Sequence, residues 1–391
     1  MLQAVLLAAG RSTRTYPLTA TRPKPLIPLL GRPLLEHLLL QLEGTVDEAI
    51  LVVGYRADAI RDRLGSRFRS LPLRYLVQRD QRGTADALLQ AVPLIEDRCL
   101  VLNGDDLYHR HDLRALTRHR TAILVTPVPD PQNRAVVTIA GDRLVDIVEK
   151  PASAPPNSLA SVGGYCLERE LLDRLQDVSL SSRGELELPD FIRMLTRESV
   201  VRYHRIERIW LPLTYAWDVL RATLFLMEKE ERARDFGVAL QSAKEILERQ
   251  DIQVGDDPVI EGPVLIGSGA ALGNSCRVTG PAVIAEGCTI GERAELERSV
   301  LFRGVRISDR ASVSHSVLGE QVQIGSGARL IADPPIGQAL EVELQGKSIP
   351  TALERLGLVA GDGAEVPAGS NVPPGTLLDA GDSWKGVWPR K

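Results

Sequence analysis

The amino-acid sequence predicts an α/β domain with a doubly wound, Rossmann-like sheet, followed by a parallel β-helix made of hexapeptide repeats. Two patterns support this prediction. From residue 1 to about 150, short apolar runs alternate with stretches of helical periodicity, as they do where parallel strands alternate with helices. From Ile260 onward an apolar residue recurs every six positions, with two steps of five, which is the period of a β-helix.

The first region contains strands and helices in alternation. Its apolar runs predict strands at 4–9, 48–53, 74–77, 99–102 and 122–126, and its helical periods predict helices at 33–42, 58–64, 84–91 and 111–118. A hairpin that turns at Gly141 and Asp142 is expected over 134–148. Ligands of doubly wound sheets bind beyond the carboxyl ends of the strands, so the residues that directly follow these runs are the candidate site.

The composition narrows the class of protein. A net charge of −4 with 25% charged residues argues against a general nucleic-acid binder. None of the four cysteines lies in a C-x-x-C pair, so we expect reduced thiols in a cytoplasmic protein and no zinc cluster. Cys276 and Cys288 are expected as stacked small residues in the core of the repeats. No apolar run has membrane-spanning length, and the N-terminus enters a strand without a basic leader, so no membrane contact is expected.

The first predicted strand leads into a segment suited to polyphosphate. It ends at Gly10, and the next four residues include Arg11 and Arg14 and no apolar side chain. A small-residue turn after a strand exposes backbone N–H groups, and cations beside them favour bound phosphates. Pro23 and Pro25 are expected to hold Lys24 in a stiff, extended conformation. The alternative is an ordinary strand–loop–helix with basic residues on its surface.

The segment from Gly10 to Leu26 resembles the signature of the sugar-1-phosphate nucleotidylyltransferases, G-x-G-T-R-x-x-P-L-T-x-x-x-P-K-P-L. The resemblance implies that Arg14 and Lys24 are the catalytic cations. Ser12 stands where the family has its second glycine, so its φ must stay negative or the backbone must tolerate a strain of about 1 kcal/mol. The nucleotide-binding residues that the resemblance implies here are Leu7, Ala8, Ala9, Gly10, Ser12 and Thr13.

A second candidate segment, 78–85, follows the strand predicted at 74–77. The amide of Gln78 can donate to and accept from a pyrimidine edge, and Gly83 is expected to leave room for a base. Thr84 is expected to cap the first turn of the next helix with its hydroxyl. The family has Q-x-x-x-x-G-T/L-A here, so the resemblance implies UTP or dTTP as the nucleotide. The alternative is a capped surface helix with an incidental glutamine.

A third segment, 102–106, follows the strand predicted at 99–102. A carboxylate at such a strand end can hold Mg²⁺ against the α-phosphate of a nucleotide. Asp105 matches the family's metal position in L-x-G-D, Gly104 is assigned to the sugar phosphate, and Asp106 is expected to form a cap or face solvent. A plain Asx turn is the alternative.

The sequence departs from the family at the second metal ligand. Relatives supply a carboxylate or an Asn from a W-x-D motif, whereas this chain has Trp210-Leu211-Pro212, and proline cannot coordinate a metal. By register, Asp218 falls at the start of the next helix and is not expected to replace the missing ligand. Fewer carboxylates predict weaker Mg²⁺ binding, although the triphosphate itself brings most of the oxygen ligands.

The sugar-phosphate residues implied by the resemblance come from three further motifs. The family's E-K-P corresponds to Glu149 and Lys150 here, for which a surface ion pair is the alternative. Gly163 corresponds to the glycine that packs against the sugar, while Ser161 replaces an Asn and leaves the sugar open. Residues 183–190 resemble R-G-E-L-E-x-T-D, whose acidic residues either reach sugar hydroxyls or lie at a helix N-terminus, the latter being preferred.

The predicted domains are a nucleotidylyltransferase domain at 1–225, a linker helix at 226–255 within one long helix from about 216 to 250, a β-helix at 256–331, and an extension with a final coil at 332–391. The resemblance implies a left-handed β-helix. Flat β-helix faces generally associate, so a homo-oligomer is expected, either a trimer or a dimer of trimers. The core row comprises Ile260, Ile266, Leu272, Val278, Ile284, Ile290, Leu296, Leu301, Ile307, Val313, Leu318, Ile324, Leu330, Ala360, Val366, Val372 and Leu378.

Amino-sugar acetyltransferases of similar layout use a histidine base in the β-helix. The matching position holds Asp309 here, the nearby tyrosine and asparagine positions hold Ser312 and Ala332, and His315 is out of register. Because acyl transfer to an amine needs a base, a structural or regulatory β-helix is preferred.

The sequence therefore predicts a sugar-1-phosphate nucleotidylyltransferase that uses Mg²⁺, UTP or dTTP, and a hexose 1-phosphate such as glucose 1-phosphate or N-acetylglucosamine 1-phosphate. Two alternatives stay open. One is a catalytically weak regulatory protein that binds nucleotide sugars, and the other is a bifunctional enzyme that also acetylates amino sugars.

Overall fold

The computed structural model describes residues 1–386, which divide into two compact units. Unit 1 comprises Met1–Arg11 and Leu34–Pro212, and unit 2 comprises Ser12–Pro33 and the residues from Leu213 onward. The segment 12–33, which carries both predicted catalytic cations, thus belongs to the same unit as the C-terminal repeats. The predicted boundaries at 225, 255 and 331 remain a prediction.

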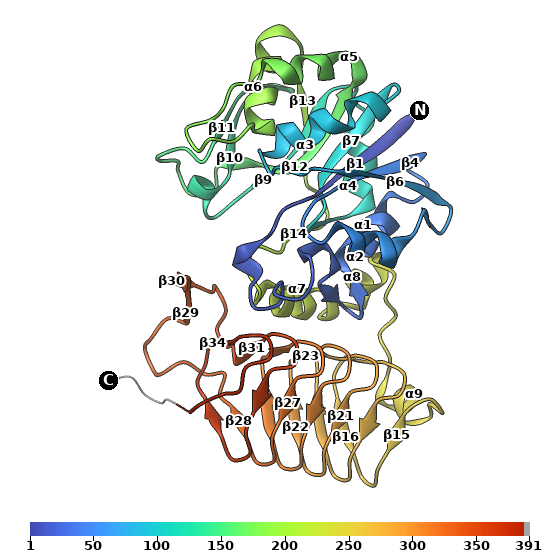
Figure 1. The fold of residues 1–391 in the computed structure, drawn as a ribbon, viewed down its shortest axis with the longest axis vertical. Coiled ribbons are helices and arrows are strands. Elements are labelled where there is room, and N and C mark those ends of the chain that lie inside the picture. The colour runs from blue at the N-terminus through green and yellow to red at the C-terminus, as the bar shows by residue number, and fades with distance from the viewer. Residues whose placement is uncertain (387–391) are drawn as a thin grey trace. The chain divides into compact units, whose positions relative to one another are not determined.

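Unit 1 is organised around a mixed β-sheet (Figure 1). Consecutive residues of its central strand point to opposite faces, and Val5 and Leu6 are both fully buried, so both faces of the sheet are covered. In spatial order the strands are β10 (Ala135–Ala140), β11 (Arg143–Glu149), β13 (Arg202–Arg205), β9 (Ala122–Pro127), β12 (Leu159–Glu168), β7 (Arg98–Asn103), β1 (Leu2–Ala8), β4 (Glu48–Val53), β6 (Leu71–Val77) and β5 (Arg67–Phe68).

The predicted strands and helices of this unit are confirmed within a few residues, and β10 and β11 form the predicted hairpin. The parallel order holds for β7, β1, β4 and β6, whereas β12 runs antiparallel to both β7 and β9. A short antiparallel pair, β8 (Asp106–Tyr108) and β14 (Trp210–Pro212), lies outside this sheet. The helices of unit 1 are α1 (Leu34–Leu42), α2 (Ala57–Leu64), α3 (Thr84–Ala91), α4 (Arg110–Leu116), α5 (Arg169–Leu172) and α6 (Leu188–Glu198).

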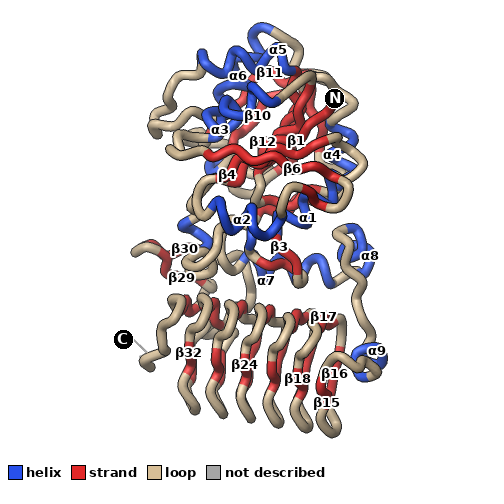
Figure 2. Tube along the Cα trace, turned by 45° about the vertical axis from the view of Figure 1, so that its right-hand side comes forward, coloured by secondary structure: helices blue, strands red, loops and turns tan. Residues whose placement is uncertain are grey.

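Unit 2 contains the β-helix, in which short strands of successive coils stack in parallel (Figure 2). Within the described residues they form three sheets. The first contains β15 (Gln253–Val254), β18 (Ala271–Leu272), β21 (Thr289–Ile290), β24 (Arg306–Ile307), β27 (Gln323–Ile324) and β32 (Glu365–Val366). The second contains β16 (Val259–Glu261), β19 (Arg277–Thr279), β22 (Glu295–Glu297), β25 (Ser312–Ser314), β28 (Arg329–Leu330) and β33 (Asn371–Val372). The third contains β17 (Val264–Ile266), β20 (Ala282–Ile284), β23 (Val300–Leu301), β26 (Val317–Leu318), β31 (Leu358–Ala360) and β34 (Thr376–Leu378).

The six-residue period is confirmed as the core of this β-helix. Ile260 pairs with Val278, and the row continues through Leu296, Val313 and Leu330 to Val372. The residues of the predicted core row are buried, apart from Ile260, which is partly buried and packs against the others. Cys276 and Cys288 are also in this core, although on different rows, since twelve residues are two-thirds of a coil.

The third sheet is apolar on both of its sides. The outward residues Val283, Val300, Val317 and Val359 are buried, and helix α7 (Asp218–Met227) packs on this sheet at β23. Helix α7 also packs against β2 (Pro28–Leu29), which forms a hairpin with β3 (Arg32–Pro33). Segment 12–33 is thereby joined to the repeats through apolar packing.

The prediction of one long helix over about 216–250 is wrong. The chain forms α7, α8 (Glu230–Asp235) and α9 (Ala243–Leu247) instead. Gly237 has a φ of 72° after α8, and Ser242 starts α9 with a capping box to Glu245, so these residues end one helix and begin the next. The expected extension between the last coils contains the hairpin of β29 (Glu341–Leu344) and β30 (Lys347–Pro350). No helix in the described part of the chain is both long and apolar enough to cross a membrane.

Candidate active site

The carboxyl ends of β1 and β7 bring several predicted residues of unit 1 together. Gly104 follows β7, and its N–H donates to the carbonyl of Leu7 at 2.9 Å. A Cβ at Gly104 would lie 3.0 Å from both Leu7 O and Ala8 Cβ, so only glycine permits this close approach. The carbonyl of Ala9 accepts from the N–H of Tyr55 and from Gln81 Nε2, which fixes the start of the turn.

Gly163 reaches the same end of the sheet from β12. It has a φ of 73° at an irregularity between Ser161 and Tyr165, and a Cβ there would lie 2.1 Å from Asn103 Nδ2. Gly163 therefore lies beside Asn103, the residue that directly precedes Gly104. The sequence analysis did not single out Asn103, although its position at a strand end before Gly-Asp is a usable signal.

The expectation that Asp106 forms a cap or faces solvent is wrong. Asp106 is buried in β8, where its backbone pairs with Pro212 of β14, and its Oδ2 accepts from Trp210 Nε1 at 3.3 Å. The antiparallel pairing of two distant segments places this carboxylate in the interior. Pro212 stands at the family's second metal position. Its strand partner is Asp106, so a carboxylate other than Asp105 lies directly beside this position.

Asp105 is half-buried and lies at the end of β7, next to Gly104. Among residues 1–386 no group of three or more His, Cys, Asp and Glu side chains could hold a metal ion. This donor set does not fit a cage made only of protein ligands. It fits Mg²⁺ as that ion is usually bound with nucleotides, by one or two carboxylates with water and phosphate oxygens.

Gln78 is 4% exposed and lies just beyond β6. Its Nε2 donates to Asp86 Oδ2 at 2.8 Å and to the carbonyl of Gly83 at 3.2 Å. An ionised carboxylate can only accept hydrogen bonds, so Asp86 fixes which end of the amide faces it. The structure gives Oε1 of Gln78 no hydrogen bond within the described residues, and this acceptor is the part of the amide left for a ligand.

Gly83 and Thr84 have roles that the sequence analysis did not predict. Gly83 has a φ of 115°, and a Cβ on it would lie 2.2 Å from the carbonyl oxygen of Leu186, so the expected room for a base is closed on that side. The Thr84 hydroxyl does not cap α3. It accepts a hydrogen bond from the N–H of Leu188 at 3.0 Å, because the segment before α6 runs alongside this turn.

Glu149 and Lys150 form a charged cluster with the segment before α6. Arg183 contacts Glu187 Oε2 at 2.5 Å and Glu149 Oε1 at 3.4 Å, and Lys150 Nζ lies 3.9 Å from the same Glu149 oxygen. Burial and the neighbouring charge of Glu187 raise the pKa of Glu149, which the two cations oppose. Two sequence motifs that were predicted separately thus meet at one place, with Glu187 at the start of α6.

Segment 12–33 of unit 2 carries Ser12, Thr13, Arg14 and Lys24. Ser12 has a φ of 51°, so its backbone is in the strained left-handed region and the alternative of a negative φ is wrong. Its carbonyl accepts from the hydroxyls of Thr15 at 2.9 Å and Thr19 at 3.1 Å, which hold the turn in this conformation. Thr13 and Arg14 follow in a single 3₁₀ turn and are exposed.

The expected extended conformation of Lys24 is also wrong. Lys24 begins a 3₁₀ turn, Lys24–Leu26, with Pro25 in its first turn, where a proline is tolerated because no N–H is needed. Its side chain is 7% exposed, and its charge acts on the carboxyl of Asp218. Burial raises the pKa of Asp218, and the nearby Arg221, the N–H groups of Tyr215 and Thr214, and Lys24 oppose that rise.

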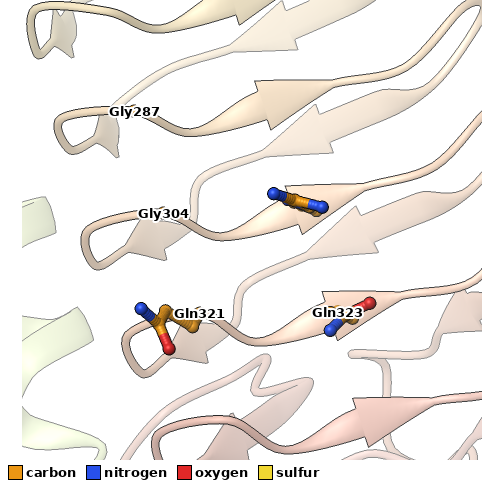
Figure 3. A pocket seen from close by; sticks show the side chains of 5 residues that line it. Gly287, Gly304, Gln321 and Gln323 are labelled. Carbon is orange, nitrogen blue, oxygen red and sulfur yellow. The ribbon is translucent and has the colours of Figure 1, made fainter.

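The β-helix contains a histidine and a shallow pocket in different places. His315 is buried, and its Nδ1 lies 2.8 Å from Ser314 Oγ, which donates to Glu297. Burial lowers the pKa of His315 to about 4. A surface pocket of about 350 Å³ (Figure 3) lies on the first sheet, and its described lining contains neither a histidine nor a carboxylate. The pocket is lined by Gly287, Gly304, Arg306, Gln321 and Gln323.

Comparison with known proteins gives matches over both regions. The model of the family described as "Nucleotidyl transferase" matches residues 3–220, and that described as "GMPPB C-terminal domain" matches residues 260–347. A solved structure from Bacillus anthracis has a TM-score of 0.52 at 25% identity, covering 57% of this chain and 94% of the other. The α/β architecture of unit 1 is therefore shared with solved proteins.

Three archaeal relatives show how far the similarity extends. The "Bifunctional protein GlmU" of Methanocaldococcus jannaschii is 33% identical over 58% of this chain, and the chain spans about half (55%) of that relative's length. The "Bifunctional sugar-1-phosphate nucleotidylyltransferase/acetyltransferase" of Sulfurisphaera tokodaii is 27% identical over 97% of this chain and 94% of its own. The "UTP--glucose-1-phosphate uridylyltransferase AglF" of Haloferax volcanii is 31% identical over 60% of this chain and 100% of its own.

Proposed function

Because the chain belongs to the nucleotidyl transferase family, we propose that it transfers a nucleotidyl group from UTP or dTTP to a hexose 1-phosphate. The products are a nucleotide sugar and pyrophosphate. Glucose 1-phosphate and N-acetylglucosamine 1-phosphate are the proposed acceptors. The observation that carries the proposal is the meeting of Leu7, Ala8, Gly104, Asp105 and Gly163 at the carboxyl ends of β1 and β7, where ligands of such sheets bind.

In the proposed reaction, an oxygen of the sugar phosphate attacks the α-phosphorus of the nucleotide in line. The bond from that phosphorus to the oxygen bridging the β-phosphate breaks, and the electron pair leaves with pyrophosphate. Both groups are already charged, so catalysis depends mainly on positioning and on neutralising charge. Arg14 holds the β- and γ-phosphates and the departing pyrophosphate, and Lys24 holds the reacting phosphates. Asp105 would hold Mg²⁺, which supplies further positive charge to the phosphate oxygens.

The proposal of a uracil or thymine base is supported by the fixed amide of Gln78. Uracil and thymine present an N–H donor between two carbonyls, whereas the same ring position of cytosine is an acceptor. The Oε1 of Gln78, which has no hydrogen bond within the described residues, can accept from that N–H, and it would repel a cytosine nitrogen. Glu149, Lys150 and Gly163 are the proposed sugar-phosphate contacts.

The direct test measures pyrophosphate release with Mg²⁺, each of UTP, dTTP, CTP and GTP, and each candidate hexose 1-phosphate. Turnover with UTP or dTTP supports the proposal. Tight nucleotide binding without turnover supports the second candidate, a regulatory protein that binds nucleotide sugars, which the replacement of a metal-site carboxylate by Pro212 favours.

Acetyl transfer is tested separately, by thiol release from acetyl-CoA with glucosamine 1-phosphate. We expect none, because Asp309 occupies the position of the base and His315 is enclosed by Ser314 and neighbouring residues. Thiol release that disappears in His315→Asn would contradict this expectation and favour a bifunctional enzyme.

A further inference from the structure

Segment 12–33 is fastened to the β-helix by ion pairs within unit 2. The side chain of Arg22 is 12% exposed, and its guanidinium lies between two carboxylates, with Nη1 3.0 Å from Glu320 and Nη2 in contact with Asp362. It also lies over the ring of Phe302, 5.4 Å from its centroid. The hydroxyl of Thr21 donates to the same Asp362 oxygen at 2.5 Å.

The two carboxylates are themselves held rigidly. Asp362 uses its other oxygen to accept from the N–H of Glu320 at 2.8 Å, so it bridges the turns of successive coils. A Cβ on Gly319 would lie 2.7 Å from that oxygen, so only glycine permits this close approach of the carboxylate. Asp362 therefore has one oxygen committed to the β-helix and the other directed at segment 12–33.

Two other turns contain the same bridge without contacting this segment. Asp309 accepts from the N–H of Glu292 at 2.9 Å, and Asn274 accepts from the N–H of Asp256 at 2.8 Å. Since Asn274 forms the bridge without a charge, the bridge requires a side-chain oxygen and no carboxylate. The negative charge of Asp362 is thus needed only for its contacts with segment 12–33.

The fastened residues lie between the two cations proposed to act on phosphate. Arg14 is two residues before Tyr16, whose pKa is raised by burial and by the nearby carboxylate of Asp379, and Lys24 is two residues after Arg22. A loop that carries two cations is an efficient phosphate clamp only if its conformation is fixed before the substrate binds. The guanidinium of Arg22 is engaged by Glu320, Asp362 and Phe302, so Arg22 acts through the segment that contains it.

We propose that Arg22, Glu320 and Asp362 are positioning residues for nucleotidyl transfer, so that the last coils of the β-helix hold the phosphate-binding segment in its active conformation. This inference rests on the proposed function, because it assumes that Arg14 and Lys24 bind the nucleotide. It assigns the β-helix a direct part in the activity of the N-terminal region.

The test compares Asp362→Asn with the matched control Asp309→Asn. Both keep a side-chain oxygen for the bridge between coils, and only the first removes the charge that faces Arg22. We expect Asp362→Asn to lower kcat at least tenfold at saturating sugar phosphate, with thermal unfolding unchanged, and Asp309→Asn to stay within twofold of the unmodified protein. Arg22→Gln should lower kcat similarly, and combining it with Asp362→Asn should add little, since each removes the same ion pair. Equal kcat in Asp362→Asn and the control would overturn the inference.

Hydrogen exchange gives a readout that does not need turnover. In Asp362→Asn, peptides covering 13–27 should exchange at least tenfold faster than in the control, while peptides of the β-helix core stay unchanged. Should the unmodified protein release no pyrophosphate, the proposed function fails while faster exchange still upholds the fastening of the segment. If Asp362→Asn shows unchanged exchange and normal turnover, the positioning role is refuted and the proposed function still stands.

Discussion

Asp86 accepts a hydrogen bond from Gln78 Nε2 at 2.8 Å in a buried contact, and this contact decides which atom of the Gln78 amide is available to a base. Without the carboxylate, only the carbonyl of Gly83, at 3.2 Å, would still accept from this end of the amide, so the amide could turn over more readily. The choice of nucleotide in the proposed reaction thus depends on a residue that need not contact the nucleotide.

We therefore predict that Asp86→Ala weakens the preference for UTP over CTP about tenfold, the effect of one hydrogen bond of roughly 1.4 kcal/mol. Competition assays with the two nucleotides measure the ratio of their kcat/KM values. The control is Gln90→Ala, because Gln90 also donates to Asp86, at 3.1 Å, without touching Gln78. An unchanged preference in Asp86→Ala would show that the base is read elsewhere.

Arg14→Ala should lower kcat about a hundredfold or more and change the KM for the sugar phosphate much less. The lost guanidinium is proposed to stabilise charge that develops on the departing pyrophosphate, which is a transition-state effect. Steady-state kinetics with the sugar phosphate varied separates the two constants. Arg61→Ala on the outside of α2 is a control for the loss of an exposed arginine. Full activity in Arg14→Ala removes the proposed mechanism.

Asp105→Asn is expected to raise the Mg²⁺ concentration needed for half-maximal activity about tenfold or more, because a neutral amide binds a hard cation less well than a carboxylate. The measurement is a Mg²⁺ titration of pyrophosphate release at fixed nucleotide. Asp97→Asn provides the comparison, since Asp97 is exposed near the N-terminal amine. A titration curve that coincides with that of the unmodified protein places the metal at another residue.

Ser12→Gly should stabilise the protein by roughly 1 kcal/mol, because glycine has no Cβ to oppose a φ of 51°. No hydrogen bond is lost within the described part of the chain, since Thr15 and Thr19 bond to the backbone carbonyl of Ser12. Urea unfolding measures the change. Ser12→Val should move the midpoint in the opposite direction, as a β-branched residue is poorly tolerated there. A lower midpoint for Ser12→Gly would contradict the assignment of strain to this turn.

Because His315 is buried, we predict that the folded protein loses stability in mild acid. The pKa of His315 is lowered by burial to about 4, so the unfolded chain binds a proton more readily than the folded one between about pH 6.5 and 4. The free energy of unfolding should decrease as the pH is lowered through this window, by at most about 1.4 kcal/mol per pH unit. Asparagine tolerates the positive φ of 46° at position 315, so His315→Asn should reduce this dependence of stability on pH. His111→Asn, at an exposed position, should leave the dependence unchanged. Equal slopes for the two variants would refute the prediction.

Local patterns were enough to predict most elements of both regions. Alternating apolar runs predicted the strands at the centre of the sheet because each is buried on both faces and contains no polar interruption. The six-residue row predicted the β-helix core because each strand of a coil must place an apolar side chain inside. The motif positions after the strands could be predicted for the same reason, since parallel strands end at one edge.

Distant pairing decided what those patterns could not. Asp106 is buried because β8 pairs with β14, more than a hundred residues away, and the antiparallel β12 brings Gly163 to Asn103. The expected long helix is divided by the turn at Gly237 and the capping box at Ser242, and the helix-forming residues around them concealed both signals in the sequence.

By itself the sequence determined the two kinds of architecture and the strand ends, which follow from local apolar patterns, and the identity of the candidate residues, which follows from their motifs. Only the tertiary structure decided that segment 12–33 packs with the C-terminal repeats and that Arg22 meets Asp362, 340 positions further along the chain. The physical reason is that an ion pair forms only where folding brings two segments together, and the local pattern of one segment carries no information about the position of the other.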